Sequence, residues 1–504
     1  MNTNCKLTTI AGITLIIALA SAVPVHASEL DDLKAQLQTM QETMAQMQKK
    51  ISRLEEENQK EKQKQRQATA TAKTQALPAE GPKEAPPSAG PASVDASGTQ
   101  VVTIAPSAVT IEGHASQVTD RPAMNDQQEA APRPNDLTLD PKYRGFIPVP
   151  NTPVLIKFNA KPRLDFTDDP QNTGNEDRFV TATIPVEGDP FKGGGNQFNA
   201  NAKGSQLSID VRAPEIDGSP RFFYQNDFFG GGGGELPIRV RQLYGEIYNL
   251  VIGQTYSVFE DPDAWPDTVD YEGPNSAVFA RRPLVRYQVP LNPHWEVNLG
   301  LEKPSSEVDT SIDPEAKSVD HAPDGGFNVR WEDSKIGHVQ FGTIFRDIGV
   351  KGPIVGDQSV FGWGVNLSSS LNLSENDSIQ TQLTYGHGLF RYFNDDFVNN
   401  DAAFDRSGDL TAIPAFGGMV GFTHKWNDTF RSTASYGYVH LDNQFSQDPT
   451  AYHLTHYASL NLVWQLRKRL SIGFEGLYGH KEEKSGADGD SFRLQLGIVY
   501  QLFD

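Results

Sequence analysis

The chain has 504 residues, of which 37% are hydrophobic, with 44 glycines, 33 prolines and a mean hydropathy of −0.48. This polar, turn-rich composition argues against one compact α/β enzyme. The 64 acidic and 44 basic residues give a formal charge of −20, which disfavours a nucleic-acid partner because the phosphate backbone is also negative. The single cysteine, Cys5, excludes disulfide scaffolds, cysteine zinc sites and thiol catalysis. No stretch after Ala22 approaches the roughly 20 apolar residues of a membrane-spanning helix, although a membrane barrel is still allowed.

Residues 1–27 have the features of a cleaved secretory signal peptide. Lys6 supplies a short positive region, and residues 10–23 form an apolar run interrupted only by small side chains. Val25-His26-Ala27 places small residues at the spacing that a signal peptidase accepts, so we expect cleavage after Ala27. The alternative is a membrane anchor, but the run is short for a span and has no stop-transfer flank.

Residues 28–66 show the heptad pattern of a coiled coil. The apolar positions alternate at spacings of three and four, and this period of 3.5 needs a partner helix to bury the seam. A lone amphipathic helix of this length is marginal in water, so we expect self-association, with the oligomer number left open. A single helix on some surface is the alternative. The predicted core positions are Leu30, Leu33, Leu37, Met40, Met44, Met47, Ile51 and Leu54.

Residues 67–150 are rich in Ala, Pro, Ser, Gly and Thr and poor in aromatic residues. Such a segment cannot bury enough apolar surface to fold, which predicts a disordered and partly extended linker. Its expected role is to let the coiled coil reach across a gap.

Residues 151–504 show the two-residue period of β-strands. From Val154 to Phe166, apolar residues interleave with charged or polar ones, so one face is apolar and the other charged. Many similar runs follow, and most exceed the roughly 5 to 6 residues typical of soluble sheets. Their length suits the roughly 9 to 11 residues of a tilted strand that crosses a membrane. The sequence therefore predicts an all-β transmembrane barrel of about 16 antiparallel strands, preceded by an α-helical coiled coil and a disordered linker.

The connections between these runs alternate in length. Tight turns such as 291–293 and 426–428 are followed by long polar excursions such as 304–325 and 390–414. Aromatic residues gather near the ends of the runs, as expected for girdles at two membrane interfaces. Short turns on one side and long loops on the other are typical of the bacterial outer membrane.

Taken together, the signal, coiled coil, Pro/Ala linker and barrel resemble the DcaP-like family of trimeric outer-membrane porins. The resemblance is carried by Arg239-Val240-Arg241-Gln242-Leu243-Tyr244-Gly245-Glu246, by Ile252-Gly253-Gln254-Thr255-Tyr256-Ser257-Val258-Phe259, by the acidic Pro-rich loop through Pro274, and by Arg281-Arg282-Pro283-Leu284-Val285-Arg286-Tyr287. The resemblance implies that this loop folds into the barrel as a constriction. It also implies a trimer that passes small anions such as dicarboxylates.

Strand parity predicts which charged residues point into the barrel. If Ile156 and Phe158 face lipid, the alternating basic residues face water, and the same test on later strands sends further arginines inward. We expect a basic pore wall of Lys157, Lys161, Arg163, Arg212, Arg239, Arg241, Arg282, Arg286, Arg330, Arg431 and Arg493. Each of these could instead form an internal ion pair that only supports the barrel.

The acidic loop is expected to lie opposite that wall and to create a transverse field. The expected constriction residues are Glu260, Asp261, Asp263, Trp265, Asp267, Asp270, Tyr271 and Glu272, with Trp265 and Tyr271 narrowing the slot. A ring of guanidinium groups lowers the entry barrier for a carboxylate, because it replaces part of the hydration shell.

Enzyme motifs are absent from the sequence. It contains no GxSxG elbow, HExxH pair or Walker sequence, and no catalytic, cofactor or metal site is predicted. Acidic runs such as Asp488-Gly489-Asp490 could collect divalent cations at the outer surface, but such runs are more often only solvated loops.

These patterns predict an outer-membrane porin for passive diffusion of small, anionic solutes. We expect a homotrimer in contact with outer-membrane lipid and lipopolysaccharide, with its coiled coil in the periplasm. An envelope-tethering or adhesive protein, with the barrel only as an anchor, is the alternative, and bilayer conductance separates the two. An outer-membrane lipase would need a Ser-His-acid set, which no motif supports.

Overall fold

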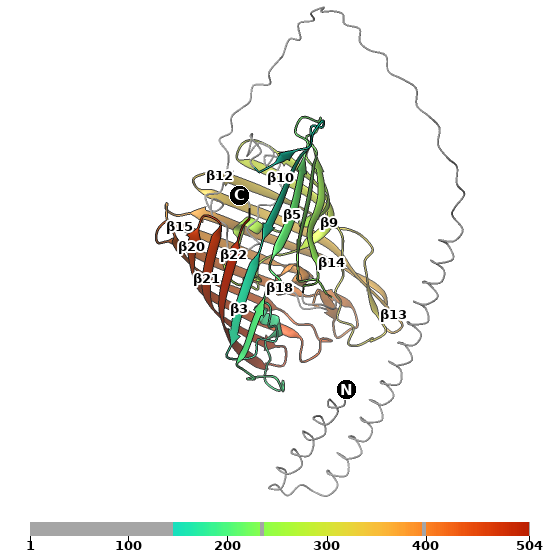
Figure 1. The fold of residues 1–504 in the computed structure, drawn as a ribbon. Coiled ribbons are helices and arrows are strands. Elements are labelled where there is room, and N and C mark those ends of the chain that lie inside the picture. The colour runs from blue at the N-terminus through green and yellow to red at the C-terminus, as the bar shows by residue number, and fades with distance from the viewer. Residues whose placement is uncertain (1–144, 232–235, 396–399, 503–504) are drawn as a thin grey trace, which may run out of the picture. The chain divides into compact units, whose positions relative to one another are not determined.

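The computed structural model describes residues 145–231, 236–395 and 400–502 (Figure 1). The predicted signal peptide and coiled coil, and the predicted linker as far as residue 144, lie outside these residues. Within the described ranges, no helix has the length and apolar character to cross a membrane.

Strands dominate the described part of the chain. The first half contains β1 (Ile147–Pro148), β2 (Leu155–Lys161), β3 (Arg163–Asp169), β4 (Gln197–Asn201), β5 (Gln206–Arg212), β6 (Arg221–Asp227), β7 (Arg239–Ile247), β8 (Leu250–Tyr256), β9 (Arg281–Pro290), β10 (Trp295–Glu302) and β11 (Lys317–Val319). The second half contains β12 (Asp324–Asp333), β13 (Gly337–Gly352), β14 (Gly356–Asn372), β15 (Asp377–His387), β16 (Ala402–Phe404), β17 (Leu410–Ala412), β18 (Pro414–Lys425), β19 (Phe430–Leu441), β20 (Tyr452–Arg467), β21 (Leu470–Glu483) and β22 (Asp488–Tyr500).

The long strands pair antiparallel with their sequence neighbours and close into a ring (Figure 1). Pairing runs from β5 through β10, β12 to β15 and β18 to β22 without a break. Closure occurs where β22 pairs with β3, as at Val499 and Arg163. Pro162 separates β2 from β3, and the two pair with β5 and β4 in turn. Only β16 and β17 form a separate small sheet among the described residues.

The alternation read from the sequence determines which way each side chain points. On β14, Phe361 and Leu367 are exposed on the outer face, whereas Asn366 and Ser368 are buried in the interior. On β22, the inward side chains include Arg493, which is fully buried. A sheet with apolar residues outside and polar residues inside is the reverse of a soluble protein and fits a membrane barrel. The predicted all-β antiparallel fold is confirmed.

Three long connections leave the same end of the ring and fold into its interior. They are the β3–β4 loop (170–196) with the 3-10 helix η3 (Thr181–Thr183), the β8–β9 loop (257–280) with η4 (Pro262–Ala264), and the β15–β18 loop (388–413) with η5 (Phe390–Tyr392). Each follows a strand that runs in the same direction, since the strands between them alternate in direction around the ring. These loops build the apolar core, in clusters such as Phe259, Val278, Ala280, Ile344 and Tyr392.

Candidate functional site

The β8–β9 loop lies against the inner wall of the barrel rather than across an open lumen. Its Asp261 carboxylate accepts bonds from the Arg330 guanidinium at 3.1 Å and the Ser368 hydroxyl at 2.6 Å, and lies 2.9 Å from His338 Nε2. Burial alone would raise the pKa of Asp261, but the nearby His338 and Arg330 outweigh it and hold the pKa below its usual value. The carboxylate is therefore an ionised anchor that fixes the loop to three strands.

Further contacts continue the attachment along the wall. Arg431 Nε on β19 donates to the Asp267 carboxylate at 2.6 Å, and the Asn275 amide donates to the Thr455 hydroxyl on β20 at 2.7 Å. These partners lie 164 and 180 residues further along the chain. The loop is thus held to strands remote in sequence by one charge-assisted bond and one neutral bond, and the charge-assisted bond is the stronger kind.

Glycines on the inner face of the strands make room for this loop. A Cβ at Gly421 on β18 would lie 2.6 Å from Pro266, and one at Gly437 on β19 would clash with Asn275. Real Cβ atoms do not make contacts this short, so only glycine at these two positions allows the loop to approach the wall this closely.

The other two loops pack onto the β8–β9 loop. Phe279 N donates to Tyr392 O at 2.8 Å, and a β-bridge joins Val278 to Phe393. From the β3–β4 loop, the Arg178 guanidinium donates to the Glu272 carboxylate at 2.7 Å. The three loops therefore meet inside the barrel.

A cavity of about 400 Å³ lies where these loops meet β7 and β9. Its lining contains five arginines and a single acid. The lining residues are Asn175, Arg178, Val180, Thr183, Arg239, Glu272, Phe279, Ala280, Arg281, Arg282, Arg391, Phe393 and Asn394.

Carboxylates compensate the lining arginines unevenly. Arg178 and Arg239 form close ion pairs with Glu272 and Asp227, at 2.7 and 2.6 Å. Arg391 and Arg282 are further from their carboxylates, at 3.5 Å from Glu307 and 4.0 Å from Glu302. The cavity thus has two tightly neutralised guanidinium groups and others whose positive charge is only partly balanced.

Arg281 is the lining arginine to which the described residues bring no carboxylate within ion-pair distance. Its Nη1 atom is buried and has no hydrogen-bond partner among the described residues. The guanidinium lies over the Phe279 ring, with 4.7 Å between its carbon and the ring centroid. Arg282 lies over the Tyr392 ring at the same distance. These rings hold two cations in place without neutralising them, which leaves donors for an anion.

Two of the residues predicted for the basic wall, Arg239 and Arg282, line this cavity. Most of the others form ion pairs inside the barrel: Arg163 with Asp165, Arg212 with Asp210, Arg241 with Asp227, Arg330 with Asp261, Arg431 with Asp267, and Arg493 with Asp169. Arg286 is buried and donates to Tyr256 O at 3.4 Å. Lys157 Nζ lies over the Phe146 ring, 5.8 Å from its centroid, and Lys161 is half-buried on β2.

The acidic residues of the β8–β9 loop do not face the basic wall across the lumen, as the sequence predicts. Asp261, Asp263 and Asp267 bind arginines of the wall directly, so these charges neutralise one another instead of facing each other across water. Glu260 accepts a bond from Ala280 N at 2.8 Å, and only Glu272 lines the cavity.

The two aromatic residues of the loop do not form a slot. Trp265 is fully buried against Phe279, with ring centroids 5.6 Å apart. The Tyr271 hydroxyl donates to Asp227 at 2.8 Å and also contacts Arg241. The apolar rings pack beneath the loop because this removes them from water, and this packing holds the loop in place.

Three lining arginines were not predicted from the sequence. Arg178 and Arg391 lie on long loops, where strand parity gives no direction. Arg281 begins β9, and parity with Arg282 would point it outward, but the chain has only just left the β8–β9 loop at this residue. The sequence feature that could have indicated Arg281 as a lining residue is the adjacent pair Arg281-Arg282 at the end of an acidic loop.

An antiparallel ring with an apolar outer surface, narrowed inside by its own charged loops, defines a channel-forming barrel of the bacterial outer membrane. The model of the DcaP outer membrane protein family matches residues 136–502, and the chain belongs to this family. The family predicted from the sequence is confirmed.

The chain is also similar to solved structures. The outer membrane channel DcaP of Acinetobacter baumannii is 20% identical, with a TM-score of 0.64, over 71% of this chain and 99% of that one. An anion-selective porin from Comamonas acidovorans is 13% identical, with a TM-score of 0.45, over 69% and 99%. OmpT of Vibrio cholerae is 11% identical, with a TM-score of 0.43, over 70% and 99%. The first supports the fold alone, and no argument rests on the other two. No curated protein matches the sequence.

Proposed function

We propose that this outer-membrane channel is an anion-preferring porin for small carboxylates, and that it works by passive diffusion without catalysis or a cofactor. The observation that carries the proposal is the cavity with five lining arginines and one lining glutamate. A carboxylate entering it meets planar donors that replace part of its hydration shell. The positive charge opposes entry of cations by the same interaction.

The strength of binding suits passage rather than retention. Arg178 and Arg239 are already paired with carboxylates, whereas Arg281 and Arg282 are backed by aromatic rings. A solute would thus exchange between a few partly neutralised sites instead of one deep one. Conduction requires binding that is favourable enough for entry and weak enough for exit.

The proposed assembly is a homotrimer of sixteen-stranded barrels. Sixteen crossings result when β2 with β3 and β4 with β5 are each counted once, followed by β6 to β10, β12 to β15 and β18 to β22. The heptad repeat at residues 28–66 supports self-association through a coiled coil in the periplasm, joined by the linker. Outer-membrane lipid and lipopolysaccharide would contact the apolar outer surface.

Reversal potentials in planar bilayers test the anion preference. The double variant R281Q/R282Q removes the two guanidinium groups that lie over aromatic rings, so the chloride-over-potassium permeability ratio should fall several-fold. R212Q is the matched control, because Arg212 points inward but does not line the cavity, and its partner Asp210 keeps Arg221 at 3.0 Å. An unchanged ratio in the double variant would refute the proposal.

A further inference from the structure

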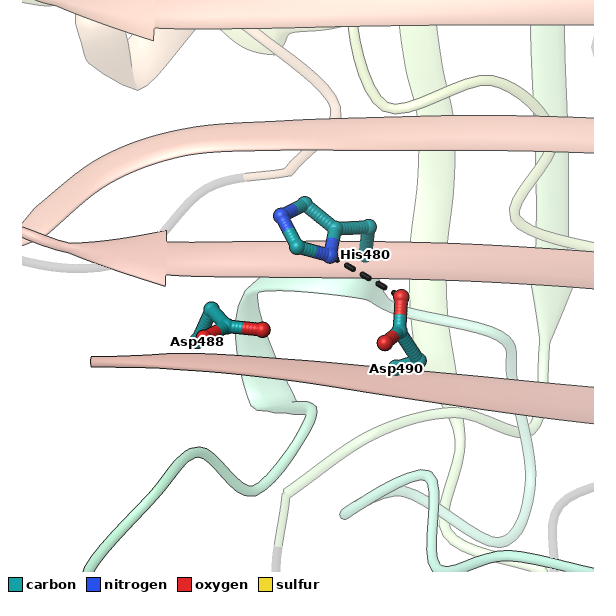
Figure 2. Close-up of side chains that lie close together, drawn as sticks. All are labelled: His480, Asp488 and Asp490. Atoms are coloured by element: carbon teal, nitrogen blue, oxygen red, sulfur yellow. Dashed lines mark hydrogen bonds and ion pairs between the residues drawn. The ribbon is translucent and has the colours of Figure 1, made fainter. Parts of the chain in front are cut away.

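Three side chains of the kinds that bind metal ions lie together on the outward face of β21 and β22, away from the cavity. His480 on β21 is the direct cross-strand partner of Asp490 on β22, and Asp488 lies two residues before Asp490 on the same face. Figure 2 shows the carboxylate of Asp490 directed at the imidazole, with Asp488 beside it. One ligand atom from each of the three residues lies within 4.8 Å of the others.

We propose that His480, Asp488 and Asp490 form a binding site for a divalent transition-metal ion of the zinc class. One imidazole nitrogen and two carboxylate oxygens are a ligand set that suits zinc better than calcium or magnesium, which prefer oxygen alone. In a tetrahedral zinc shell, bonds of roughly 2.0–2.1 Å place neighbouring ligand atoms about 3.4 Å apart. His480 Nδ1 and Asp490 Oδ1 are already 2.9 Å apart, so a small side-chain movement brings these two ligand atoms to that separation.

Neighbouring residues hold the ligands in place. The Tyr478 hydroxyl donates to Asp490 Oδ1 at 2.5 Å, which orients this carboxylate toward His480. Hydrogen bonds of this kind fix the ligands of natural metal sites and tune their affinity. The ligands are also held by two paired strands rather than by a loose loop, and this reduces the entropy lost when the ion binds.

A second imidazole lies next to the three ligands. His456 on β20 is the cross-strand partner of His480, and their ring centroids are 5.6 Å apart. The Tyr436 hydroxyl lies 2.6 Å from Nδ1 of His456, which leaves Nε2 as the nitrogen for a further partner. Two imidazoles at adjacent cross-strand positions are close enough to share an ion after side-chain rotation. His456 thus provides a fourth ligand to a site built on three strands.

The Lys192 ammonium lies near the site but pairs with a different carboxylate. Lys192 Nζ donates to the backbone oxygen of Asp488 at 2.7 Å and lies 3.8 Å from the Glu187 carboxylate. The carboxylates of Asp488 and Asp490 are therefore not neutralised by direct contact with this ammonium. Their negative charge attracts a divalent ion, although Lys192 reduces the attraction.

A bound ion would link the ends of β21 and β22. This matters for the barrel because β22 is the strand that closes the ring against β3. On β21, His480 comes directly after the exposed outward residues Phe474 and Tyr478. The site therefore lies near the turn 484–487, where the outward face of the barrel changes from apolar to polar. An ion that binds only the folded protein stabilises it by mass action.

Zinc titration of the full-length protein in detergent tests the proposal, after metal is removed with a chelator. Calorimetry with ZnCl2 should show saturable binding of about one ion per chain at this site. The variants H480A and D490N should weaken it by about tenfold or more. Zinc should raise the melting temperature of the wild type but not of these variants.

Two control variants separate this site from other histidines. His424 lies 2.7 Å from Asp377 without forming a three-residue group, and His440 packs on His453 with centroids 4.8 Å apart. H424A and H440A should bind zinc like the wild type. The proposal fails if the wild type shows no saturable binding, if H480A retains full affinity, or if H440A alone abolishes binding. D488N supplies the same test should H480A fold poorly.

Discussion

Arg178 and Glu272 form an ion pair at 2.7 Å that joins the β3–β4 loop to the β8–β9 loop at the wall of the arginine cavity. The carboxylate raises the pKa of Arg178, more than enough to offset the opposite effect of burial. Glu272 is also the single acid among the lining residues. This one carboxylate therefore both positions a loop and sets the charge of the cavity.

Replacing Glu272 with Gln should increase the anion preference of the channel. The substitution keeps the shape of the side chain but removes the negative charge, so the Arg178 guanidinium becomes available to a passing anion. We expect the chloride-over-potassium permeability ratio, measured from reversal potentials, to rise several-fold. E176Q is the control, because Glu176 lies on the β3–β4 loop, as Arg178 does, but does not line the cavity. A ratio that falls or stays constant in E272Q would contradict this prediction.

The anion preference should also increase as the pH falls from 7 to 5. Burial raises the pKa of Asp270 to about 6, and nearby Glu272 adds to the effect while Arg493 opposes it. Protonation in this range removes a negative charge two residues from Glu272. Because the pKa is raised on folding, the proton binds the folded state more tightly, and the resulting stabilisation is present at low pH and lost as the pH rises through about 6.

The variant D270N separates this effect from other titrating groups. Its permeability ratio should change less between pH 7 and 5 than that of the wild type, and at pH 7 it should already resemble the wild type at pH 5. Phe179 N and Gly273 N donate to the Asp270 carboxylate, and the remaining amide oxygen of Asn still accepts from one of them. An identical pH response in the two proteins would exclude Asp270 as the titrating group.

The barrel was predictable from sequence because its signal is local. Alternation along a strand such as residues 492–500 records which side chains face lipid, and each run carries this information without reference to any other. The strand runs, the antiparallel order and the polar interior all follow from that single pattern.

The arrangement inside the barrel was not predictable in the same way. Asp261 binds Arg330 and His338, which are 69 and 77 residues away, and no pattern within the loop indicates those partners. The sequence predicts the acidic loop to be one side of a transverse field, whereas the arginines of the wall bind its carboxylates directly. Burying separated charges costs several kcal/mol per ion, so pairing them is the favoured arrangement in a crowded interior.

The position of Gly421 predicts that the channel is sensitive to a single added methyl group. In G421A, the new Cβ would lie 2.6 Å from Pro266, and the β8–β9 loop must move away from β18. We expect altered single-channel conductance and noisier open levels, because the displaced loop loses its contacts with the wall. G245A is the control, since a Cβ at Gly245 meets its nearest atom, Arg221 O, at 3.8 Å. Conductance in G421A equal to that of the wild type would show that the loop does not narrow the pore.

The bond between Asp267 and Arg431 should contribute more to stability than an ion pair on the surface. Both side chains are buried, at 7% and 6% exposure, and Nε lies 2.6 Å from the carboxylate. D267N leaves the Arg431 charge in the interior without this carboxylate, and breaking a buried pair in this way costs about 3 kcal/mol. The exposed pair between Lys351 and Asp357 contributes about 0–1 kcal/mol at most, so D357N serves as the control.

Guanidinium-induced unfolding in detergent, followed by tryptophan fluorescence, measures this difference. The midpoint of D267N should shift to a clearly lower denaturant concentration, while that of D357N stays near the wild type. The D267N channel should also show a changed conductance at denaturant concentrations below its unfolding midpoint, since Asp267 attaches the β8–β9 loop to β19 and this loop opens before the ring of strands. Equal midpoints for D267N and D357N would mean that the apolar residues beneath the loop, Trp265 among them, hold it in place without the ion pair.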